Sequence, residues 1–207
     1  MKLMCFACVA AVSIAVPASA ELEPVFALDV SIAPTAEGAP IRSEDWVYER
    51  LDLAERVLSS IKVHFHIWHW RTVGRELARI EDPRERDRFA PLVAPTEINV
   101  FVVERLRDNE VKDLYRMGVT WDSHTTPSAR FIILSADCVR SSLAHELGHF
   151  PGIQPHSFVK NNLMGYDRDD ALVFLDPSQQ TLVIARAHTL RTSGALFTFG
   201  WFVGSNH

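Results

Sequence analysis

Residues 145–167 read HELGHFPGIQPHSFVKNNLMGYD, and the chemistry of this stretch decides how the rest of the chain is interpreted. His145 and His149 are spaced by about one helical turn, so both imidazoles can reach one metal ion from the same helix face. Glu146 lies beside them, where a carboxylate can hold and deprotonate a metal-bound water. With nine histidines in the chain, this five-residue pattern is expected by chance on the order of 0.02 times. The pattern therefore predicts a hydrolytic metal site.

Three features that follow the five residues strengthen this prediction. Pro151 and Gly152 end the helix, because proline cannot continue it and glycine tolerates a left-handed turn. A further histidine, His156, comes shortly after that turn. Met164 and Tyr166 then complete the stretch.

Together these residues resemble the metzincin clan of zinc metallopeptidases, whose pattern is H-E-x-x-H-x-x-G-x-x-H followed by a methionine-containing Met-turn. The resemblance implies one catalytic Zn²⁺ ion with His145, His149 and His156 as ligands. It further implies that Glu146 is the general base and that Gly152 makes the turn. Zinc with three protein ligands keeps a position open for water and lowers the pKa of that water to about 7.

The resemblance extends to the residues after the third histidine. It places Met164 beneath the metal, and residues 162–166 are most similar to the turn of pappalysin-type members. Tyr166 matches the tyrosine that astacin-like and serralysin-like members place two residues after the methionine, where it stabilises the tetrahedral intermediate. The match covers about a tenth of the chain. The rest of the chain shares no motif with the clan, and only the order of its predicted elements is compatible with it.

The chain departs from the clan pattern in one place. Three residues rather than two separate Gly152 from His156, so Pro155 occupies the expected ligand position. Either the loop absorbs one extra residue and His156 reaches the ion, or the third ligand lies elsewhere. Glutamate is excluded because no glutamate follows Glu146. The aspartate alternatives are Asp167, Asp169, Asp170 and Asp176.

Residues 1–20 resemble a secretory signal peptide, with an early Lys2, an apolar run and an A-x-A cleavage site. The predicted protein is therefore exported, to the periplasm or outside the cell. Cys5 and Cys8 leave with this segment, so the mature chain keeps only Cys138 and forms no internal disulfide.

Residues 21–207 are of a size that suits one catalytic domain. The formal charge of −5, with no basic patch, argues against a nucleic-acid partner.

The expected fold class is α+β and metzincin-like: a twisted mixed sheet, two long helices, an active-site helix, a Met-turn and a small C-terminal subdomain. Helical spacing with Ser43 as N-cap predicts a helix over residues 44–61, and the pair Asp176–Pro177 predicts the start of a helix over 177–191. Strands are expected at 26–32, 62–70, 96–103 and 131–134; the second alternates, with Val63, Phe65 and Ile67 on one face, and the third is buried. Residues 108–118 are expected to form a short helix or turn, 119–129 an irregular segment that lines the substrate groove, and 195–203 a last strand or rim. Ser135–Asp137 are expected to cap the active-site helix, with Val139, Leu143, Leu147 and Phe150 as its apolar stripe.

Two functions from different classes remain open at this point. The favoured one is an exported, monomeric zinc endopeptidase that acts on protein or peptide substrates and has no membrane span. The alternative is a zinc-binding module without catalysis, for which the displaced His156 argues and the presence of Glu146 and Tyr166 argues against. His64 and His66 share a strand face and could bind a second metal, although exposed or hydrogen-bonded histidines are the favoured interpretation. His124 and His188 are expected at the surface.

Overall fold

The computed structural model describes residues 23–108, 111 and 113–199. The predicted signal peptide at residues 1–20 therefore lies outside the described residues. The helices and strands that the structure describes are β1 (Val25–Ile32), α1 (Glu44–Leu58), η1 (Ser59–Ile61), β2 (His64–Thr72), η2 (Arg75–Leu77), β3 (Arg79–Ile80), η3 (Pro83–Leu92), β4 (Ile98–Val103), β5 (Arg105–Leu106), β6 (Gly118–Asp122), β7 (Arg130–Ser135), α2 (Ser142–His149), α3 (Pro177–Thr192) and β8 (Thr198–Phe199).

The main sheet is mixed, with strand order β2-β1-β4-β7-β6 and a short β8 that pairs with the start of β1. The strands β2, β1, β4 and β7 run parallel, whereas β6 is antiparallel to β7 and β8 is antiparallel to β1. Both β4 and β7 are buried along almost their whole length and are mostly apolar, because the two core clusters cover both faces of the sheet centre. The predicted α+β class with a twisted mixed sheet is confirmed.

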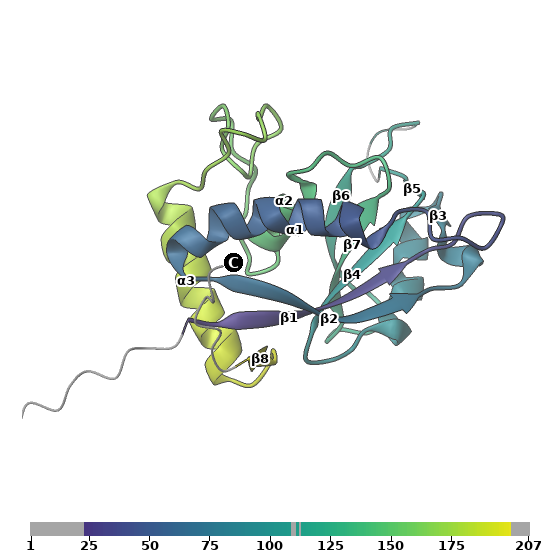
Figure 1. Cartoon of the computed structure of the whole chain (residues 1–207), viewed down its shortest axis with the longest axis horizontal. Helices are drawn as coiled ribbons and strands as arrows, with labels where there is room; N and C mark the ends of the chain where they lie inside the picture. The colour runs from purple at the N-terminus through teal and green to yellow at the C-terminus, as the bar shows by residue number, and fades with distance from the viewer. Residues whose placement is uncertain (1–22, 109–110, 112, 200–207) are drawn as a thin grey trace, which may run out of the picture.

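The helix α1 lies along one face of the sheet (Figure 1). Ser43 caps it by accepting a hydrogen bond from the Trp46 amide at 3.2 Å, as the sequence predicts. Its buried side chains recur at helical spacing and join the larger core cluster with β1, β2, β4, β7 and α2. Because α2 belongs to the same cluster, the main hydrophobic core directly supports the helix that carries His145 and His149.

The opposite face of the sheet has a second, smaller core. Phe89 of η3 packs against Phe101 of β4 and Phe131 of β7, with ring centroids 4.6 Å and 6.2 Å away. An Asp82 and Glu85 capping box starts η3. The charged segment Pro83–Leu92 therefore covers the second sheet face.

The helix α3 lies at one end of the molecule (Figure 1). Asp176 caps it and Pro177 takes its first position, as predicted. The predicted last strand is present as β8, and residues 200–207 lie outside the described part. Among the described helices, none is long and apolar enough to cross a membrane.

The structure corrects two predictions near the active-site helix. Residues 119–122, expected to be irregular, belong to the strand β6; it lies at the sheet edge and is only half-buried, and only two of its residues, Val119 and Trp121, are apolar, which is too short an alternation to identify a strand. The active-site helix begins at Ser142, and its N-cap residue Ser141 makes no side-chain capping bond. A turn over residues 136–141 separates the predicted cap, Ser135–Asp137, from the helix. Val139 lies in this turn with 46% of its surface exposed, so it is not part of the apolar stripe.

Candidate metal centre

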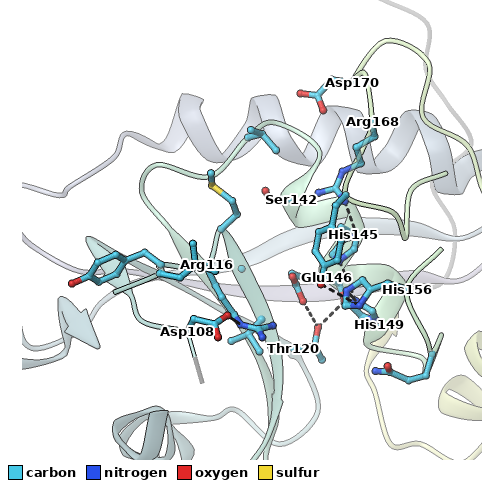
Figure 2. Close-up of a pocket in the computed structure, with 18 of the residues that line it drawn as sticks. Asp108, Arg116, Thr120, Ser142, His145, Glu146, His149, His156, Arg168 and Asp170 are labelled. Atoms are coloured by element: carbon cyan, nitrogen blue, oxygen red, sulfur yellow. Dashed lines mark hydrogen bonds and ion pairs between the residues drawn. The ribbon is translucent and has the colours of Figure 1, made fainter. Parts of the chain in front are cut away.

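The helix α2 presents three polar side chains that are almost fully buried. His145, Glu146 and His149 keep 5%, 4% and 6% of their surface exposed. Leu143 and Leu147 turn to the opposite side and anchor the helix in the main core. The short helix thus holds its polar residues toward a cleft of about 890 Å³ that His156 and Tyr166 also line (Figure 2).

Three imidazoles meet in this cleft. The Nε2 atom of His149 lies 3.1 Å from the Nε2 of His145 and 3.1 Å from the Nε2 of His156. The extra residue before His156 is accommodated by a loop in which Gly152 has a φ of +104° and the Gln154–Pro155 peptide bond is cis. The structure therefore brings the displaced histidine to the two helical ones.

Hydrogen bonds fix the protonation of two of these rings. The Nδ1 of His145 lies 2.7 Å from the carbonyl oxygen of Leu163, and the Nδ1 of His149 lies 2.8 Å from that of Ile153. A carbonyl oxygen only accepts, so each Nδ1 carries the hydrogen and each Nε2 keeps its lone pair. Burial lowers the pKa of His145 to about 3 and that of His149 to about 4, so both rings are neutral at pH 7.

This arrangement fits a metal ion. Two unprotonated nitrogen atoms at 3.1 Å point their lone pairs at each other, which is unfavourable unless a cation lies between them. Nitrogen ligands on tetrahedral zinc lie roughly 3.3 Å apart, given Zn–N bonds of about 2.0–2.1 Å. Ligand atoms of His145, His149 and His156 all lie within 4.8 Å of one another.

The aspartate alternatives for a third ligand do not join this group. Within the described residues, no metal-holding group pairs the two helical histidines with an aspartate. Asp176 caps α3, and its carboxylate accepts from the Gln179 amide and the Ser178 hydroxyl. Asp169 and Asp170 line the cleft without entering the group, and Asp167 is exposed.

The Glu146 carboxylate is held by the edge strand β6. The Thr120 hydroxyl lies 3.0 Å from Glu146 Oε2 and 2.9 Å from the Glu146 main-chain oxygen. Burial raises the pKa of Glu146 to about 7, against the lowering effect of the Thr120 hydrogen bonds. A Cβ atom on Gly118 would lie 2.9 Å from Glu146 Oε1, so glycine there leaves room for the carboxylate.

The turn at residues 162–165 packs directly beneath α2. Met164 is fully buried, and a Cβ atom on Gly148 would lie 2.6 Å from the Met164 sulfur. The turn is fixed by the buried Asn162, whose side chain accepts from the Met164 amide at 2.9 Å and donates to Gln179 of α3 at 2.9 Å. The absence of a side chain at Gly148 therefore permits the close approach of Met164.

Tyr166 follows this turn and stands at the open side of the cleft. Its hydroxyl lies 3.3 Å from the Nδ1 of His156, and its ring centroid lies 4.6 Å from that of His156. The side chain is otherwise open to solvent, with 76% of the residue exposed. The phenol can therefore meet a substrate in the cleft.

The sequence does not predict two residues that contribute to the site, Thr120 and Arg168. Thr120 gives no signal, because an isolated threonine in a half-exposed strand is ordinary. Arg168 follows the turn closely and donates to the Ser141 hydroxyl at 2.9 Å and to the carbonyl oxygen of Gly165. This arginine ties the turn to the start of α2, and only its position near Met164 hints at the contact.

Comparison with known proteins supports the fold. No family model and no curated protein matches the sequence. Among solved structures, metalloproteinase-II from Bacteroides fragilis is similar with a TM-score of 0.54 and 11% identity over 82% of this chain; the chain spans 55% of that protein's length. The archaemetzincin from Methanopyrus kandleri is similar with a TM-score of 0.53 and 14% identity, covering 79% of this chain and 96% of its own. The chain therefore has the fold of these two proteins.

Proposed function

We propose that this chain is a zinc-dependent peptidase whose metal is held by His145, His149 and His156. The observation that carries this proposal is the convergence of three imidazole Nε2 atoms beside a buried carboxylate that is not itself among them. A site that only binds metal needs no such carboxylate. The two similar structures, of a metalloproteinase and an archaemetzincin, are consistent with the proposal.

Zinc bound at this site supplies a Lewis acid that polarises a carbonyl group and lowers the pKa of water. Glu146 accepts a proton from the attacking water and delivers it to the leaving amine. In the metal-free chain burial raises the pKa of Glu146 to about 7, so this carboxylate can both take up and release a proton near neutral pH. Thr120 holds this carboxylate on the side of the edge strand.

The substrate is proposed to be an extended segment of a peptide or protein, cleaved internally. β6 has β7 as its strand neighbour on one side, and its residues Val119 and Thr120 line the cleft. An extended peptide beside β6 would bring its scissile carbonyl toward the three histidines. Tyr166 is placed to donate a hydrogen bond to the oxygen that becomes negatively charged in the transition state.

The proposed setting is that of an exported, monomeric single domain, with residues 1–20 as the signal peptide. The pattern of residues 145–166 favours membership of the metzincin clan, with a turn of the pappalysin type. A zinc-binding module without catalysis is the second candidate.

The test is cleavage of quenched fluorescent peptide libraries by the chain that begins at Glu21. Activity should disappear with a chelator and return with added zinc. Glu146→Gln should keep its zinc and lose activity by roughly 10²–10⁴-fold, the contribution of a general base. A zinc-loaded wild type that cleaves none of the library peptides favours the module without catalysis, and a Glu146→Gln variant with full activity excludes the assigned base.

A further inference from the structure

A second group of potential ligands lies in the half of the sheet away from β6. Asp29 of β1, His69 of β2 and Glu97, which precedes β4, place one ligand atom each within 4.8 Å of the others. The Nδ1 of His69 lies 3.0 Å from Glu97 Oε2. None of these residues lines the cleft of the three histidines, so the group is distinct from the peptidase site.

A β-bulge creates this group. Leu28 of β1 pairs with Ile67 of β2, but the next residue, Asp29, pairs with His69 rather than with Trp68. In a regular ladder Trp68 would stand beside Asp29, and His69 would be one position further along. Bulges re-aim side chains and are frequent at functional sites. Here the extra residue sets an imidazole beside a carboxylate.

The Asp29 carboxylate is buried, and its negative charge is only partly compensated. Its side chain is 1% exposed, and within the described residues neither of its oxygen atoms accepts a hydrogen bond. Arg71 Nη2 approaches Oδ2 to 2.8 Å, but without the alignment of a hydrogen bond, and the Arg71 side chain is 46% exposed. A buried carboxylate without hydrogen bonds is unfavourable, and a bound cation would satisfy it.

We propose that Asp29, His69 and Glu97 form a second metal site that takes a divalent transition-metal ion, zinc being the best match to one imidazole and two carboxylates. Calcium and magnesium prefer oxygen ligands alone, so the imidazole disfavours them. The three ligands, two carboxylates and one neutral imidazole, together carry two negative charges, which a divalent cation neutralises. Arg71, whose Nη2 lies 2.8 Å from Asp29 Oδ2, then helps to orient the Asp29 carboxylate, as residues around metal ligands commonly do.

The site has a structural role, because its ligands come from three separate segments. β1 lies between β2 and β4 in the sheet, and the ion would join all three near the point where the chain enters β4. His69 is 45% exposed at its side chain and Glu97 is 11% exposed, so an ion can enter from the His69 side. The inference does not depend on the peptidase proposal.

To test this proposal, the three-histidine site is removed by mutation and the metal that remains bound to the chain is measured. In the His145→Ala/His149→Ala variant of the chain, zinc by atomic emission after dialysis should be about one ion per chain, and added Zn²⁺ should raise the melting temperature. Adding His69→Ala should remove that ion and abolish the temperature shift. Glu97→Gln, which keeps the side-chain shape, should reproduce both effects if His69→Ala alone folds poorly.

The matched control is His66→Ala in the same background, which removes a histidine from the same strand but not from the group. This variant should keep the ion and the temperature shift. A His145→Ala/His149→Ala chain that holds no zinc and does not respond to Zn²⁺ would overturn the proposal, leaving an ion-pair network of Asp29, Arg71, His69 and Glu97. Zinc that survives both His69→Ala and Glu97→Gln would overturn it as well.

Discussion

The Thr120 hydroxyl of the edge strand lies 3.0 Å from the carboxylate of Glu146 on the active-site helix. This contact joins the strand that borders the cleft to the proposed general base. A threonine hydroxyl has one hydrogen, which it shares between this carboxylate and the Glu146 main-chain oxygen 2.9 Å away. The contact orients the carboxylate without neutralising it.

Thr120→Val removes that hydrogen bond while keeping the shape of the side chain. We expect kcat to fall roughly ten- to hundred-fold, because a hydrogen bond to a charged group contributes about 1.5–3 kcal/mol. Zinc content should not change, since Thr120 does not contact a histidine of the site. Steady-state kinetics and metal analysis check both points, with the exposed Thr181→Val of α3 as control. An unaltered kcat would reduce Thr120 to a packing residue.

His156→Ala tests the third ligand. Two helical histidines alone leave zinc with half its usual coordination, so the variant should lose most of its zinc on dialysis. His124→Ala and His188→Ala remove exposed histidines and should keep the metal. Atomic emission gives the metal per chain; because the second proposed site also holds zinc, the comparison is made in a His69→Ala background. If His156→Ala stays loaded there and Asp167→Ala is empty, an aspartate-ligated site replaces the three-histidine one.

Tyr166→Phe removes the phenol that lies 3.3 Å from His156 Nδ1. A group that acts on the developing oxyanion contributes in the transition state, so kcat should fall while KM and zinc content stay near the wild-type values. Full kinetic curves separate the two parameters. A change in KM alone would instead assign Tyr166 to substrate binding.

Glu146 also predicts a pH dependence for the metal-free protein. Its folded pKa of about 7 is raised above the unfolded value of 4.5, so its contribution to stability is fully present below pH 4.5 and is lost as the pH rises through 7. Glu146→Gln should therefore stabilise the chelator-treated chain relative to wild type at pH 8, by up to about 3 kcal/mol, and much less at pH 5.

Urea denaturation at the two pH values measures this difference. The lowered pKa values of His145 and His149 act in the opposite sense: their stability is present above pH 6.5 and lost as the pH falls toward 4 and 3. Both proteins share these histidines, so their effect cancels in the comparison. A difference in stability that is the same at pH 5 and pH 8 would contradict the raised pKa of Glu146.

Local patterns in the sequence determined several helices, the inward face of a strand and the histidines of the candidate site. The cap at Ser43, the pair Asp176–Pro177 and the alternation of Val63, Phe65 and Ile67 predict α1, α3 and the inward face of β2, and the structure confirms each. The spacing within residues 145–156 identified the histidines that the structure brings together. These features depend on neighbours within one or two turns of chain, which the sequence displays directly.

The tertiary structure alone decided which distant residues meet. Residues 118–122 become a strand because β7 supplies the partner for their hydrogen bonds, and this pairing sets Thr120 against Glu146. The bulge in β2 sets His69 beside Asp29, and the folding of the 162–165 turn under α2 requires the missing side chain at Gly148. Strand register and the approach of packed elements come from contacts between residues far apart in the chain, and no local periodicity records them.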